Sequence, residues 1–138
     1  MPRPKATGGP VFFRNPVEFR AWLEKHGATV GELLVGFHKV GTGKPSLTWP
    51  QSVDEALCFG WIDATQRRRD EDTNEQLLTP RRPRSTWART NKVRVERLIA
   101  EGLMTPAGQR AIDVAKANGS WEALDSVERG EVPDDLTE

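Results

Sequence analysis

Three helix-capping residues, each followed within two positions by proline, restrict this chain to short helices joined by other elements. Asn and Thr side chains accept hydrogen bonds from the free backbone N–H groups at a helix start. Proline suits the first turn because it has no N–H to leave unpaired. The three pairs are Asn15–Pro16, Thr48–Pro50 and Thr105–Pro106.

The apolar spacing that follows these starts predicts amphipathic helices. The first runs from Asn15 to Gly27, and the last runs from Thr105 to Gly119 with Ile112 on its inner face. The second begins near Thr48, where Ser52 and Glu55 offer an overlapping capping box. Another helix is predicted after a cap at Ser85 or Thr86, and its inner face would be Trp87, Asn91, Val95, Leu98 and Ile99.

Short apolar runs between the helices predict strands. Residues 33–40 alternate with Leu33, Val35 and Phe37 on one face, and Lys39 continues that row. Residues 61–69 and 75–81 flank a polar turn, which is typical of a hairpin. The sequence therefore predicts an α+β fold, with a small antiparallel sheet of about three strands packed against about four helices and a helical C-terminal part.

The length of 138 residues fits one domain, which we expect to span residues 11–125. Residues 1–10 are expected to form a flexible leader and residues 126–138 an acidic tail that frays. No apolar run is long enough to span a membrane and the start lacks the apolar part of a signal peptide, so we expect a cytoplasmic protein without membrane insertion.

The single cysteine, Cys58, has no internal disulfide partner. With only His26 and His38 beside it, the usual tetrahedral zinc ligand sets are not available, and we expect neither a metal nor a cofactor. Because Cys58 stands between Leu57 and Phe59, it is interpreted as a small core residue.

The net charge is zero, but charge is distributed unevenly. Residues 80–97 contain seven basic residues and one acid, whereas residues 113–138 contain eight acids and two basic residues. A basic segment of this kind predicts an anionic partner, or a charged surface that the acidic end balances.

Eight residues form the candidate ligand site. Alternation puts Trp61 and Asp63 on one face of the hairpin, where Arg81 or Arg82 would lie beside Asp63 on the neighbouring strand. One arginine would pair with Asp63 and the other would hold a phosphate or carboxylate, against an indole wall. In the alternative interpretation the tryptophans are core residues and the ion pair lies on the surface. The eight residues are Lys39, Trp61, Asp63, Arg81, Arg82, Ser85, Trp87 and Asn91.

Two motifs carry a resemblance to a known family. They are GWID at residues 60–63 and PRRPRSTW at residues 80–87, together with flanking similarity over residues 12–121. In these the chain resembles the YdeI/OmpD-associated proteins of bacteria, which are linked by name to bacteriocin protection. The resemblance implies a cytoplasmic α+β protein associated with the stress response, and it implies no catalytic residues. Ala64 and Ala88 stand where similar proteins often have Gly and Ser.

The residues support a binding protein for a small anion as the first interpretation. A nucleic-acid-binding module is the second. In it the basic segment 80–97 would contact the phosphate backbone of the nucleic acid, and Trp87 would stack on a base. An enzyme is the third, with Asp63 as a general base or Cys58 as a nucleophile. A protein partner is a fourth interpretation, for which the sequence identifies no interface.

Overall fold

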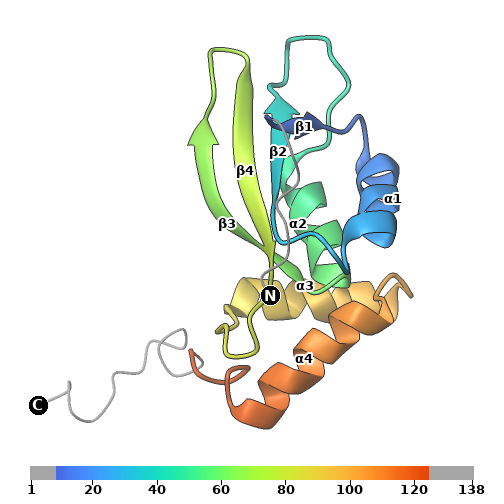
Figure 1. Cartoon of the computed structure of the whole chain (residues 1–138), viewed down its shortest axis with the longest axis vertical. Coiled ribbons are helices and arrows are strands. Elements are labelled where there is room, and N and C mark those ends of the chain that lie inside the picture. Colours follow the sequence, from blue (N-terminus) through green and yellow to red (C-terminus); the bar gives the residue numbers. More distant parts are fainter. Residues whose placement is uncertain (1–8, 125–138) are drawn as a thin grey trace, which may run out of the picture.

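A computed structural model describes residues 9–124 of the chain. In it a hairpin and two further strands stand above a pair of helices (Figure 1). The predicted leader lies outside the described residues except for Gly9 and Pro10, and the predicted acidic tail lies wholly outside them.

The described residues form four helices and four strands. The helices are α1 (Pro16–His26), α2 (Trp49–Cys58), α3 (Arg89–Ala100) and α4 (Pro106–Asn118). The strands are β1 (Val11–Phe12), β2 (Leu33–His38), β3 (Trp61–Arg68) and β4 (Thr73–Pro80).

The sheet has the strand order β1-β2-β4-β3. Strands β2, β4 and β3 are antiparallel, as the sequence predicted, and β1 adds a short parallel pairing with β2. The predicted α+β class is therefore confirmed, with one strand more than expected. The register of the β3–β4 hairpin shifts between Asp63 and Thr65, so Ala64 has no opposite residue.

The predicted caps explain where three of the helices begin. Asn15 accepts a hydrogen bond from the Glu18 N–H, and Thr105 accepts one from the Gly108 N–H. The second helix uses Thr48 together with Gln51 as its capping box, rather than Ser52 with Glu55.

The start predicted for α3 is wrong. Neither Ser85 nor Thr86 caps it; α3 begins at Arg89 after Ala88, which forms no side-chain cap. Trp87 therefore precedes the helix, next to Ala88, whose backbone is extended, and the Trp87 side chain is buried. Ile99, placed on the inner face, is 44% exposed.

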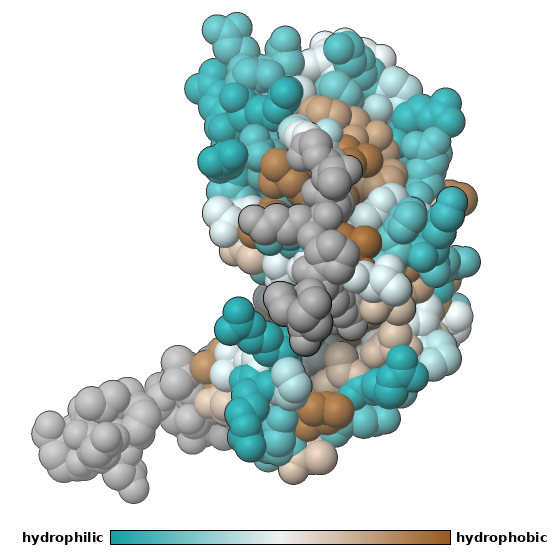
Figure 2. Space-filling model, viewed as in Figure 1, coloured by the Kyte–Doolittle hydropathy of each residue, from teal (hydrophilic) through white to brown (hydrophobic). Residues whose placement is uncertain are grey.

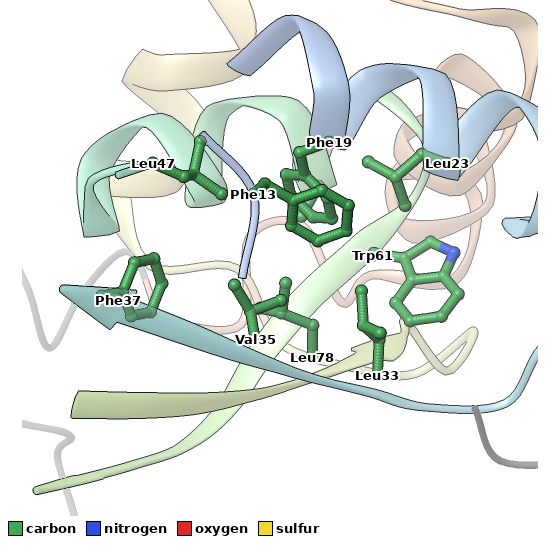
Figure 3. Close-up of a cluster of buried hydrophobic side chains, with 10 residues drawn as sticks. Phe13, Phe19, Leu23, Leu33, Val35, Phe37, Leu47, Trp61 and Leu78 are labelled. Carbon is green, nitrogen blue, oxygen red and sulfur yellow. The ribbon is translucent and has the colours of Figure 1, made fainter. Parts of the chain in front are cut away.

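Two apolar clusters hold the layers together. In the first, α1 and α2 pack on one face of the sheet, and Figure 3 shows Trp61 beside Leu23 and Leu33 in this cluster. In the second, α2 packs against α3 and α4, and Cys58, Trp87 and Ile112 are buried there. The core positions predicted for Cys58 and Ile112 are thus confirmed.

The surface over the outer part of the hairpin is hydrophilic (Figure 2). Among the described residues, no helix has both the length and the apolar composition that crossing a membrane requires.

Candidate functional site

The predicted site residues fall into two groups at opposite ends of the sheet. Lys39 follows β2 beside the hairpin turn, whereas Arg81 follows β4 at the other end (Figure 1). Thr73, opposite His38, and Pro80, opposite Trp61, are seven positions apart on β4. At about 3.3 Å per residue this is about 23 Å. The structure therefore does not bring Lys39 to the site of Arg81.

Arg81 lies in close contact with Trp87. Its guanidinium carbon is 3.7 Å from the centroid of the Trp87 ring, and its Nη2 donates a 2.7 Å hydrogen bond to the Thr86 carbonyl oxygen. The backbone N–H of Arg81 donates to the Gly60 carbonyl oxygen at 2.8 Å. The arginine is therefore held from both its backbone and its side chain.

Two guanidinium nitrogens of Arg81 have no partner in the part of the chain that the structure describes. Nε and Nη1 are buried, and within residues 9–124 neither donates a hydrogen bond. Burial lowers the pKa of Arg81 to about 10, and the nearby Asp63 carboxylate acts in the opposite direction. Since this value is still well above neutral pH, Arg81 remains a cation, and the three N–H donors on its Nε and Nη1 have no acceptor within residues 9–124.

The sequence predicted that Asp63 pairs with Arg81 or Arg82, but within residues 9–124 Asp63 forms no hydrogen bond with an arginine. Its Oδ2 accepts a 3.1 Å hydrogen bond from Gln76 Nε2 instead. The hairpin register places Asp63 opposite Leu78. Gln76 lies two positions before Leu78 on β4, and its side chain is therefore on the same face of the sheet. Asp63 contributes only its charge to the surroundings of Arg81.

The two tryptophans are structural as well as adjacent to the site. Both are 1% exposed. The indole Nε1 of Trp61 donates a 3.0 Å hydrogen bond to the Gly27 carbonyl oxygen, and the ring packs edge-on against Trp22. Trp87 packs against Trp121 with ring centroids 5.0 Å apart. The core interpretation of these residues is confirmed, and Trp61 also lines a pocket.

The remaining predicted residues lie around the turn that follows Arg81. Arg82 is exposed, and its carbonyl oxygen accepts the Ser85 N–H. Ser85 and Asn91 are half-buried, and Asn91 lies in the first turn of α3. None of these three lines the pocket beside Arg81.

We call this cavity the Arg81 pocket; it has a volume of about 390 Å³. It lies between the end of α1, the start of β3 and the first turns of α4. Arg81 and Arg110 contribute two positive charges and Glu24 one negative charge. Its apolar walls come from Leu23, Phe59, Trp61, Pro80, Ala107 and Ala111.

The close approach of α4 to the start of β3 shapes this pocket. A Cβ atom added to Gly60 would lie 3.2 Å from the Ala107 carbonyl oxygen, and Gly60 has a φ of 79°. Glycine at this position therefore permits both the turn into β3 and the contact with α4. Arg110, on the same helix, was missed by the sequence reasoning, because its relevance depends on how α4 packs against the sheet.

Cys58 has surroundings that suppress thiol reactivity. Burial raises the pKa of the Cys58 thiol to about 11, with an opposing contribution from Arg20. The thiol is therefore protonated at neutral pH, and the thiol is a poor nucleophile compared with the thiolate.

Comparison with known proteins identifies a family but no function. The family model described as Domain of unknown function (DUF8412) matches residues 11–111, so the chain belongs to this family. No curated protein and no solved structure matches the chain. The family description makes no link to the YdeI/OmpD-associated proteins, and that resemblance stays a prediction.

Proposed function

We propose that this member of the DUF8412 family is a binding protein that holds a small phosphate- or carboxylate-bearing molecule in the Arg81 pocket. The observation that carries the proposal is the buried guanidinium of Arg81, with Nε and Nη1 unpartnered within residues 9–124. A buried donor without an acceptor costs about 1–3 kcal/mol, and more when it is charged. An anion that reaches these donors would offset that cost.

The geometry of the arginine supports an anionic ligand. One face of the guanidinium is covered by Trp87, and Nη2 is fixed on the Thr86 carbonyl oxygen. Nε and Nη1 are the donors left over, and arginine donors are well matched to carboxylate and phosphate oxygens. Arg110 at the same pocket adds a second positive charge, and among the described residues its side chain forms no ion pair.

The size and walls of the pocket favour a small molecule. Its volume of about 390 Å³ falls in the range of small-molecule sites, which is roughly 300–1,000 Å³. Apolar walls beside two arginines suit a ligand with an anionic group and an apolar body. Binding is expected in the micromolar to millimolar range.

The second interpretation, nucleic-acid binding through residues 80–97, receives less support. Arg94 and Arg97 both pair with Asp54, at 3.2 and 2.8 Å, and Arg97 also pairs with Glu101. Because these pairs occupy much of the basic helix, fewer cations are left for a phosphate backbone. The enzyme interpretation also receives little support. The Asp63 carboxylate accepts a hydrogen bond from Gln76, and the raised pKa of the Cys58 thiol disfavours the reactive thiolate.

The biological setting follows from the resemblance alone. On the strength of the GWID and PRRPRSTW motifs, we propose a cytoplasmic role in bacterial protection against envelope-acting agents, exerted through ligand binding. No protein partner is proposed.

Calorimetric titration tests the binding proposal. Inorganic phosphate, glucose 6-phosphate and succinate would be added to the wild-type chain and to Arg81→Met, which keeps the apolar volume and removes the cation. At least one of these anions should bind the wild type and bind Arg81→Met at least tenfold more weakly. Lys25→Ala, on the exposed surface of α1, is the control for loss of one positive charge. Equal affinities for wild type and Arg81→Met, or no binding of any anion, would contradict the proposal.

A further inference from the structure

A second hollow contains Lys39, the predicted site residue that does not reach the Arg81 pocket. We call it the Lys39 groove; its volume is about 510 Å³. It lies between the end of β2, the loop of residues 40–48, the start of α2 and the hairpin. Its lining includes the polar and aromatic residues Lys39, Lys44, Trp49, Gln66 and Asn74.

The hairpin contributes two amide side chains to the groove. Asn74 is opposite Phe37, whose side chain belongs to the core-facing row of β2. Gln66 is opposite Gln76, which is itself opposite the buried Val35. Both amides therefore lie on the face of the sheet that the helices cover, at the end beyond the first core cluster.

Four polar side chains of the groove have no hydrogen-bonding partner among the described residues. Within residues 9–124, the side chains of Lys39, Lys44, Gln66 and Asn74 form no hydrogen bond or ion pair. Each amide offers two donors and one acceptor oxygen, and each lysine offers three donors. The groove therefore gathers free hydrogen-bonding groups around one space.

The charge of the groove is positive, although the whole chain is neutral. Lys39 and Lys44 both line it, and none of its described lining residues is Asp or Glu. The neighbouring hollow differs, because Asp70, Glu71 and Asp72 line it together with Arg69. Acidic side chains are thus present at this end of the sheet, but they line the neighbouring hollow and not the Lys39 groove.

An aromatic ring stands at the start of α2. Trp49 is 36% exposed, and it is the most exposed of the five tryptophans, all of which lie within residues 9–124. Arg94 lies 5.7 Å from its ring centroid, and the ring lines the groove. An exposed indole beside free amides is suited to stacking on a planar ring, as aromatic side chains stack on bases in nucleic-acid complexes.

We propose that the Lys39 groove binds a nucleotide. The base would lie beside Trp49, with its heteroatom edge on Gln66 and Asn74, and the phosphate would lie between Lys39 and Lys44. Planar amides match the donor and acceptor pattern of a base edge, adenine in particular. The groove volume suits a single nucleotide unit. This site is separate from the Arg81 pocket, about 23 Å away along the sheet.

Calorimetry with three related compounds tests whether ring and phosphate are both recognised. In Arg81→Met, which removes the cation of the Arg81 pocket, AMP should bind at least tenfold more tightly than adenosine, which lacks the phosphate, and than ribose 5-phosphate, which lacks the base. No binding of AMP at millimolar concentration would overturn the proposal. Equal binding of ribose 5-phosphate would also overturn it, because the base would then contribute nothing.

Substitutions locate the site. Lys39→Ala combined with Lys44→Ala should weaken AMP binding at least tenfold, and Gln66→Ala should weaken it severalfold, with melting temperatures close to wild type. Lys25→Ala is the matched lysine control and should leave AMP affinity unchanged. If AMP binding is lost in Arg81→Met and kept in the double lysine variant, AMP occupies the Arg81 pocket and the groove proposal is wrong.

Discussion

The guanidinium of Arg81 lies against the indole of Trp87, with Cζ 3.7 Å from the ring centroid. The two residues come from the segment between β4 and α3, and the extended backbone before α3 lets Trp87 turn into the core. The ring thereby supports the cation on one face. Arg81 is thus held in one position while two of its guanidinium nitrogens, among the described residues, have no acceptor.

Replacement of Arg81 by methionine should separate a ligand role from a structural role. Methionine removes two buried guanidinium nitrogens that have no acceptor within residues 9–124, and this gain offsets the loss of the hydrogen bond to the Thr86 carbonyl oxygen and of the contact with Trp87. We expect the free energy of unfolding of Arg81→Met, measured by urea denaturation, to lie within about 1 kcal/mol of wild type or above it. A loss of several kcal/mol would contradict this expectation. It would show that Arg81 supports the fold, so that weaker anion binding by Arg81→Met could result from a disturbed structure.

Trp61→Phe should lower stability. The substitution removes the hydrogen bond to the Gly27 carbonyl oxygen and leaves part of the Trp61 volume empty in the first core cluster. Together these changes should lower the free energy of unfolding by about 2–4 kcal/mol. Urea denaturation measures the change. Val17→Ala, at a position 77% exposed on α1, is the control and should have little effect.

Gly108→Ala should disturb the packing of α4 against the end of α2. A Cβ at this position would overlap the Cys58 carbonyl oxygen and crowd the sulfur of Met104. Because the carbonyl belongs to the backbone, α4 would have to shift, and overpacking of this kind costs about 1–3 kcal/mol. Thermal unfolding should show a lower melting temperature.

The same shift should weaken anion binding, because Thr105, Pro106 and Ala107 line the Arg81 pocket. Gly9→Ala is a matched control, since an added Cβ there meets no atom within 4 Å. Unchanged stability of Gly108→Ala would indicate that the contact between α4 and α2 is looser than described.

The thiol of Cys58 should react slowly in the native protein. Its pKa is raised from 9.0 to about 11 by burial, so the folded state keeps its proton in a pH range where the unfolded state loses it. The free energy of unfolding should therefore decrease as the pH rises from about 9 to 11. Alkylation by iodoacetamide at pH 8, followed by mass spectrometry, should be slow in buffer and fast in urea. Rapid native alkylation would contradict the burial of Cys58.

Local signals in the sequence predicted much of the fold. Asn15, Thr48 and Thr105 cap helices through bonds to residues three positions away, so their effect can be inferred without knowledge of the fold. Strand β1 was missed because two residues form a strand only when β2 is beside them. The start of α3 was misplaced because Trp87 is buried by tertiary packing before the helix begins.

The candidate site was predictable only in part. The contact of Arg81 with Trp87 joins two residues of one motif, and both were singled out. The separation of Lys39 from them depends on the direction of each strand, and the relevance of Arg110 depends on where α4 packs. Both are long-range properties that spacing along the chain does not determine. The pairing of Asp63 with Gln76 likewise depends on the register of β3 against β4.

NMR observation of the arginine side chains tests the central claim most directly. The Nε–Hε signal of Arg81, assigned by its absence in Arg81→Met, would be followed during titration with the anion that binds best in calorimetry. We predict a saturable shift of this signal and slower exchange of its proton with water, because the free donor gains an acceptor. A saturating anion that leaves the Arg81 signal unmoved would contradict the account.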